Sequence, residues 1–155
     1  MVLLLPGEQH PDDSSDYVVR LKAVIAAHGL EKRVQITGYL PAEQVPRVMA
    51  VADLAIAPFL ESSGSASLAH LLAYRLPVLA SDIPPHRELL AENPGSLSLF
   101  PVGNPTAMAE QIETLLDDVS LRGSLQEGAA RFCAHHSFAH VARKTLEIYR
   151  RALQK

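Results

Sequence analysis

A loop of serine and glycine residues between two apolar segments is the part of this 155-residue sequence best suited to chemistry. The segments 53–58 before it and 77–80 after it are predicted to be short buried strands. The loop leads into a helix rich in alanine and leucine, so it lies between the carboxyl end of a strand and the amino end of a helix. Unpaired backbone N–H groups and the helix dipole favour an anion there. We therefore expect a binding site for an anionic group in this loop.

Glu61 and the loop residues after it are the candidate functional groups. Glu61 precedes the helix by several residues, so stabilisation of a first helical turn is a weaker explanation for its presence. A solvated loop carboxylate is the alternative to a functional role. The serine hydroxyls either cap the helix or, with backbone N–H groups, hold a phosphate. The loop residues concerned are Ser62, Ser63, Gly64 and Ser65.

Other chemistries have less support in the sequence. His136 and His140 have the spacing of half a metal site, but no carboxylate or thiolate accompanies them, so we expect no bound metal. The glycine motifs of dinucleotide and P-loop sites are absent, as is the nucleophile motif of serine hydrolases. Cys133 lies far in sequence from any recognisable base, which favours a packed thiol.

Net charge, cysteine count and the length of apolar runs bear on the partners and the compartment of the protein. The formal net charge of −3 argues against a nucleic-acid partner, which normally requires a basic excess. A single cysteine excludes a disulfide within the chain and favours a reducing compartment. No run approaches the ~18–20 apolar residues of a membrane span, and the apolar opening is too short for a secretory signal. We expect a cytoplasmic protein without a membrane span.

Apolar runs alternate with helical segments along the chain. Strands are expected at 2–5, 33–38, 53–58, 77–80 and 97–100. Helices are expected from residue 17 to Gly29, after Pro41, after the serine loop, and over 86–91, 106–116, 120–132 and 138–153. This alternation predicts an α/β fold, a doubly wound (Rossmann-like) parallel sheet of about five strands with helices on both faces. The length predicts a single domain over residues 1–155.

Several short motifs come in an order and at a spacing that resemble a known family. The motifs are LLLPG at 3–7, VQITGYL at 34–40, ADLAIAP at 52–58, ESSG at 61–64, PVLAS at 77–81 and the closing segment 138–149. Together they resemble the C-terminal, nucleotide-sugar-binding domain of retaining glycosyltransferases of the GT-B fold (glycosyl transferases group 1). The resemblance covers essentially the whole chain. It implies half of a GT-B architecture, without the family's first strand of this domain and without its N-terminal acceptor domain.

The resemblance also implies roles for residues of the central loop. The donor would bind at the carboxyl ends of the strands, in agreement with the general rule for open α/β sheets. Glu61 matches the first of two family glutamates and would be the catalytic residue facing the donor sugar. His70 stands at the second, which holds the ribose, although its spacing from Glu61 is one residue too long. Arg75 stands where the family has a helix-ending glycine.

The remaining implied contacts are with the nucleotide. The residues that would border the base are Gly38, Tyr39 and Pro58. The residues that would line the phosphates are Ser62, Ser63, Gly64 and Ser65.

The implied function is donor binding in the transfer of a hexose from a nucleoside diphosphate sugar to a glycan or lipid-linked acceptor, as in polysaccharide biosynthesis. No metal or other cofactor is expected. The implied partners are the sugar nucleotide and an N-terminal acceptor domain or a partner transferase chain, and this chain alone is expected to be inactive. The alternative is a non-catalytic, glycosyltransferase-like module for binding or partner association. The absent diphosphate-clamping Arg and Lys of the family and the histidine at position 70 motivate this alternative.

Overall fold

The computed structural model describes residues 1–7, 16–61 and 66–154. The chain forms two compact units, Met1–Val48 and Met49–Lys155. The single domain over residues 1–155 therefore stays a prediction.

The first unit contains two parallel strands and a helix. Strand β1 (Leu3–Pro6) pairs with β2 (Val34–Gly38), and α1 (Tyr17–Ala27) lies between them in sequence. Gly29 follows α1 with a φ of 64°, a left-handed conformation that glycine adopts without a Cβ clash, so the predicted helix end is confirmed.

The helix α1 buries fewer side chains than its periodicity predicts. The three- and four-residue spacing of four apolar residues predicts that they share the covered face: Tyr17, Leu21, Val24 and Ile25. Of these, Ile25 is buried and Leu21 is half-buried, whereas Tyr17 and Val24 are exposed. Apolar spacing gives the direction of the covered stripe but not its width, so the expectation was wrong for these two residues.

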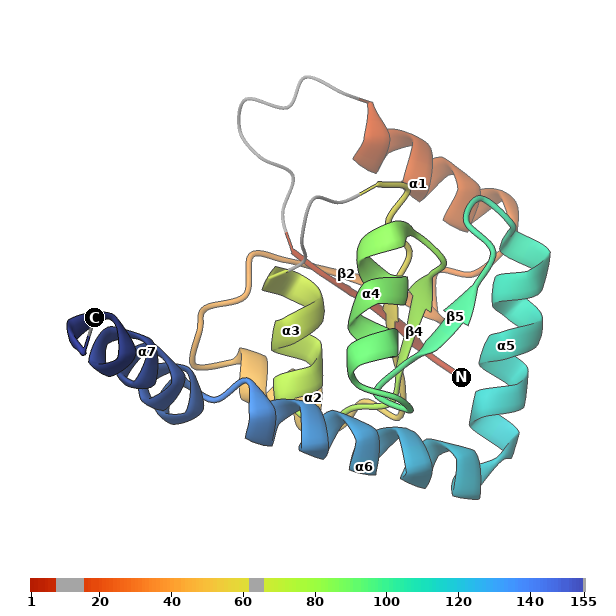
Figure 1. Ribbon diagram of the computed structural model, residues 1–155. Coiled ribbons are helices and arrows are strands. Elements are labelled where there is room, and N and C mark those ends of the chain that lie inside the picture. Colours follow the sequence, from red (N-terminus) through yellow and green to blue (C-terminus); the bar gives the residue numbers. More distant parts are fainter. Residues whose placement is uncertain (8–15, 62–65, 155) are drawn as a thin grey trace. The chain divides into compact units, whose positions relative to one another are not determined.

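The second unit is built on a three-stranded parallel sheet. Its strands are β3 (Ala55–Ala57), β4 (Val78–Ser81) and β5 (Ser98–Phe100), in the order β3-β4-β5. Strands β4 and β5 lie side by side in Figure 1. All four residues of β4 are buried, which is typical of a central parallel strand covered on both faces. Strand β3 is shorter than expected, because Asp53 and Pro58 are exposed and proline has no N–H for a ladder hydrogen bond.

The α/β fold with parallel strands and flanking helices is confirmed, and the described residues form five strands, in agreement with the expected number of about five. Hydrogen bonding in the described part of the chain divides these strands between two sheets, β1-β2 and β3-β4-β5, rather than the one sheet expected. An apolar run identifies a strand but carries little information on which strand lies beside it.

Six further helices follow in the part of the chain that the structure describes. They are α2 (Val45–Ala50), α3 (Ala66–Ala73), α4 (Pro84–Glu92), α5 (Pro105–Asp117), α6 (Val119–His135) and α7 (Phe138–Leu153). Side chains cap three of them: Asn104 accepts from the Ala107 N–H at 3.0 Å to begin α5, and Asp118 and Ser137 do the same for α6 and α7. Helix α6 packs against α3 and α5 (Figure 1).

The second unit holds two apolar clusters. The larger lies between α3, α6 and the sheet and includes Leu72, Val78 and Phe132. The smaller lies between α5, α6 and the sheet and includes Leu79 and Leu115. Helix α7 contributes to neither cluster and has no buried residue.

Candidate functional site

The carboxyl ends of β3, β4 and β5 meet at one edge of the sheet, because all three strands are parallel. The chain leaves β3 there through Pro58 and reaches Glu61 four residues after Ala57. It leaves β4 at the same edge through Ser81 and Asp82. In open α/β sheets this edge is the usual place for a ligand.

Glu61 and Pro58 are both exposed in the segment that follows β3. An exposed carboxylate at this edge is available to a ligand, but it is equally what a solvated loop residue would show. The four loop residues after Glu61, namely Ser62, Ser63, Gly64 and Ser65, lie outside the described residues. The structure therefore leaves their phosphate-binding role as a prediction, as it does the role of Glu61.

His70 lies on α3 and is exposed. Its ring lies beside that of Tyr74, one helical turn further on, with 5.2 Å between the ring centroids and an interplanar angle of 38°. No described contact engages His70 with the segment that follows β3, and its contact with a ribose stays a prediction.

Gly38 and Tyr39 belong to the first unit. Gly38 ends β2 with a φ of 66°, and Tyr39 after it is 72% exposed. A tyrosine presented to solvent in this way can stack on a nucleobase. Its place relative to residues of the second unit stays a prediction.

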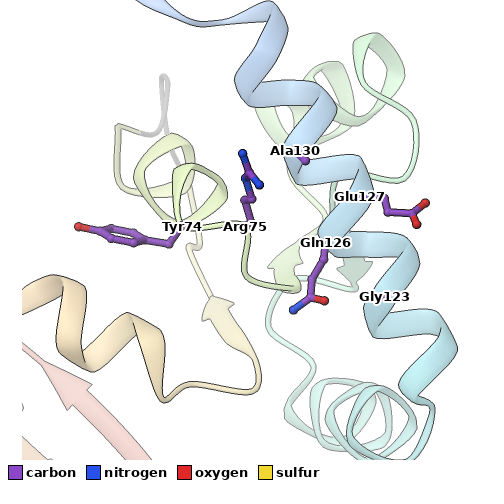
Figure 2. Close-up of a pocket in the computed structure, with 6 residues that line it drawn as sticks. All are labelled: Tyr74, Arg75, Gly123, Gln126, Glu127 and Ala130. Atoms are coloured by element: carbon purple, nitrogen blue, oxygen red, sulfur yellow. The ribbon is translucent and has the colours of Figure 1, made fainter.

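An open groove of about 550 Å³ lies elsewhere in the second unit (Figure 2). Its lining residues are Tyr74, Arg75, Gly123, Gln126, Glu127 and Ala130. Tyr74 and Arg75 precede β4, so the groove lies toward the amino end of that strand, away from Ser81. None of the predicted site residues lines this groove, which makes it a poor candidate for the donor site.

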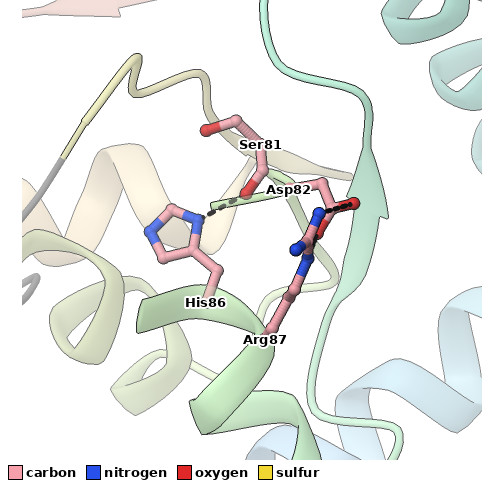
Figure 3. A network of polar contacts seen from close by, with 4 residues as sticks. All are labelled: Ser81, Asp82, His86 and Arg87. Carbon is pink, nitrogen blue, oxygen red and sulfur yellow. Dashed lines mark hydrogen bonds and ion pairs between the residues drawn. The ribbon is translucent and has the colours of Figure 1, made fainter. Parts of the chain in front are cut away.

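A polar network at the carboxyl end of β4 was not predicted from the sequence (Figure 3). Ser81 is 1% exposed, and its hydroxyl donates to the Phe59 carbonyl oxygen at 2.5 Å. His86, also 1% exposed, lies 2.7 Å through Nδ1 from the Ser81 carbonyl oxygen. Because a carbonyl only accepts, Nδ1 carries the proton. The other ring nitrogen, Nε2, is buried and has no hydrogen-bond partner among the described residues.

Asp82 and Arg87 form an ion pair beside this network. The Arg87 Nε donates to Asp82 Oδ1 at 2.5 Å, and Nη2 donates to Oδ2 at 2.9 Å. The hydrogen bonds from Arg87 lower the pKa of Asp82 despite its partial desolvation, and the carboxylate raises the pKa of Arg87. The pair ties the chain after β4 to the first turns of α4.

The histidines weighed as a metal half-site are engaged in ring contacts. His136 stacks on Phe132 with 4.2 Å between centroids, and His135 meets His140 edge-on at 6.1 Å. Desolvation, followed by the charges of Lys144 and Arg143, lowers the pKa of His140. Within residues 1–7, 16–61 and 66–154, no three His, Cys, Asp or Glu side chains are grouped so that they could hold a metal ion.

No helix in the described part of the chain has the length and apolar character needed to cross a membrane.

Two curated proteins of Streptomyces kanamyceticus are similar in sequence. Alpha-D-kanosaminyltransferase is 29% identical over 131 residues, which are 84% of this chain and 34% of that protein. The 2-deoxystreptamine glucosyltransferase is 27% identical over 136 residues, which are 87% of this chain and 35% of that protein. The chain thus spans about a third of the length of these relatives.

Solved structures share the fold. HepE of Anabaena, crystallised in complex with UDP, matches with a TM-score of 0.83 and 23% identity over 96% of this chain and 40% of that one. Sucrose-phosphate synthase of Thermosynechococcus elongatus matches with a TM-score of 0.80 and 21% identity over 98% of this chain and 38% of that one.

The family described as glycosyl transferases group 1 matches residues 2–118, most of the chain. These residues include β1 to β5, the segment after β3 that carries Glu61, and the network around Ser81. The resemblance seen in the sequence is thereby confirmed, and the chain belongs to the glycosyl transferases group 1.

Proposed function

We propose that this chain supplies the donor-binding part of a glycosyltransferase that moves a hexose from a nucleoside diphosphate sugar to an acceptor. The observation that carries the proposal is the family match over residues 2–118, which includes the sheet edge where Glu61 follows β3. The fold match to HepE, crystallised with UDP and with UDP-glucose, supports a uridine nucleotide as the first ligand to test.

The proposed contacts follow the path of a sugar nucleotide. Glu61 faces the donor sugar and is the proposed catalytic residue, while His70 approaches the ribose. Backbone N–H and hydroxyl groups at residues 62–65 hold the diphosphate at the start of α3, where the helix dipole favours negative charge. Gly38, Tyr39 and Pro58 border the base.

The reaction needs an acceptor as well as a donor. We propose that acceptor binding comes from a further domain, either in the same polypeptide or in a partner transferase chain. No metal requirement is proposed, because donors at a helix amino end supply the compensation for the diphosphate charge. A cytoplasmic location is proposed on the basis of the single cysteine.

Calorimetric titration with UDP and UDP-glucose tests the proposal. We expect one weak site for UDP. The substitution Glu61→Gln should weaken UDP-glucose binding by roughly 10- to 100-fold and leave UDP binding nearly unchanged, because a hydrogen bond to a charged carboxylate contributes roughly 1.5–3 kcal/mol and Glu61 is assigned to the sugar.

Glu113→Gln provides the matched control, since Glu113 is an exposed carboxylate on α5. It should bind both ligands as the wild type does. Absence of heat with UDP, GDP and ADP and with their sugar-linked forms would show that the chain binds no donor. A different outcome is that both proteins bind UDP and that Glu61→Gln binds UDP-glucose as tightly as the wild type does. This outcome would support the non-catalytic module instead.

A further inference from the structure

The hydroxyl of Ser81 continues the connection between β3 and β4 beyond the end of their ladder. The register of the two strands ends at the pair Ala57 and Ala80. One residue further along β4, the Ser81 hydroxyl lies 2.5 Å from the Phe59 carbonyl oxygen and 3.3 Å from that of Ala57. A hydroxyl has one proton, so the shorter distance marks the main bond. The side chain thus replaces a backbone hydrogen bond at the point where the chain leaves the sheet.

His86 reaches the same point from the first turn of α4. Its Nδ1–H donates to the Ser81 carbonyl oxygen at 2.7 Å. Its ring meets the Phe59 ring edge-on, with 6.0 Å between centroids and an interplanar angle of 62°. The imidazole therefore contacts both partners of the Ser81 hydroxyl bond, and it does so while almost fully buried.

We propose that Ser81 and His86 are positioning residues for the donor site. They fix the backbone at Ala57–Phe59, which is the start of the segment that carries Pro58 and Glu61 to the carboxyl edge of the sheet. This assignment rests on the proposed function, because Glu61 is the residue that the fixed segment presents. Neither side chain touches the donor itself.

Ser96 gives a natural comparison for Ser81. It is also fully buried, and its hydroxyl has no hydrogen-bond partner among the described residues. The fold therefore contains one buried serine that holds the segment after β3 and one that does not. Replacing either serine with alanine removes a hydroxyl oxygen from a fully buried side chain.

Amide hydrogen exchange of the native protein tests the positioning role. In Ser81→Ala we expect the amides of residues 57 and 81, at the end of the ladder between β3 and β4, to exchange about three- to tenfold faster than in the wild type, the factor expected for one neutral hydrogen bond. Ser96→Ala should leave these amides unchanged, and thermal melts of both variants identify any loss of global stability. Equal acceleration in both variants, or none in Ser81→Ala, would overturn the proposal.

A second pair of variants keeps the test decisive if Ser81→Ala does not fold. His86→Asn retains an N–H that can donate to the Ser81 carbonyl oxygen, whereas His86→Leu retains bulk without a donor. Exchange at residues 57 and 81 should be close to wild type in His86→Asn and faster in His86→Leu. Identical exchange in the two variants would remove His86 from the positioning role.

Titration with UDP-glucose connects the exchange result to the donor site. We expect Ser81→Ala to weaken UDP-glucose binding at least about twofold, because a less fixed segment presents Glu61 less often in the binding geometry, and Ser96→Ala to bind as the wild type does. Wild-type affinity in Ser81→Ala would show that the segment is held for another purpose. If the wild type binds no nucleotide, the proposed function fails, and the exchange data alone still decide whether Ser81 and His86 hold this segment.

Discussion

Arg75 occupies a backbone conformation that normally belongs to glycine. Its φ is 56°, the one left-handed value among the described residues other than glycine. Its N–H donates to the Leu72 carbonyl oxygen at 2.8 Å, as in a Schellman-type end of a helix. The position therefore keeps the turn that a glycine would form, at the steric cost of placing a Cβ in the left-handed region.

Replacing Arg75 with glycine should stabilise the protein by roughly 0.5–1 kcal/mol, since relief of the left-handed strain exceeds the added entropy of the unfolded chain. The expected rise in the midpoint of a thermal melt is about 2 °C. Arg75→Ala is the control, because alanine removes the guanidinium but keeps the strained Cβ. An equal rise in both variants would mean that the side chain, and not the backbone conformation, is the source of the effect.

The sequence predicts the local structure of some residues and not of others. The position of Arg75 was identified by the glycine it replaces, and the turn there is retained. His86 carries no such signal: a polar residue after two prolines reads as an exposed helix start, and its burial depends on Phe59 and Ser81 from other elements. A contact between distant parts of the chain leaves no local mark in the sequence.

Helix α6 contains two glycines whose surroundings differ sharply. A Cβ built on Gly128 would lie 1.9 Å from the Gly95 carbonyl oxygen, in the turn between α4 and β5. A Cβ on Gly123 would meet nothing within 4 Å. The close approach of α6 to this turn therefore depends on Gly128, while Gly123 only lowers the helix propensity.

The substitution Gly128→Ala should cost about 2–4 kcal/mol, because backbone of the 95–96 turn or of α6 must move to admit the methyl group. The matched substitution Gly123→Ala should gain up to about 1 kcal/mol from helix propensity alone. Urea unfolding of both variants measures the difference. Similar midpoints for the two would show that the turn adjusts freely and that the packing of α6 does not require a glycine.

Helices were predicted from the sequence more closely than the pairing of strands. The predicted helix over 106–116 is α5, whose start is fixed by Asn104 and Pro105, and the helix over 138–153 is α7. Strand pairing was not predictable to the same degree. Short apolar runs are interchangeable as neighbours, so the division into two sheets follows from three-dimensional packing that the runs do not encode.

Buried side chains are concentrated in the second of the two units, residues 49–155. Both apolar clusters lie entirely within residues 49–155. Among the described residues of the first unit, only Ile25 is buried. The motifs of the family resemblance occur in both units, which is why the sequence predicts a single domain. The burial of side chains, by contrast, is much higher in residues 49–155 than in residues 1–48.

The fragment 49–155 should fold without residues 1–48. Domains of about 100 residues can support a core of their own, and this segment holds both clusters, β3-β4-β5 and the helices that cover them. We expect a single cooperative thermal transition within about 5 °C of that of the full chain, measured by circular dichroism. A second fragment, residues 49–136, omits α7. It should melt at the same temperature as the fragment 49–155, because α7 buries no residue. A broad, non-cooperative melt of 49–155 would mean that the first unit completes the core, and that residues 1–155 form one folding domain as the sequence predicts.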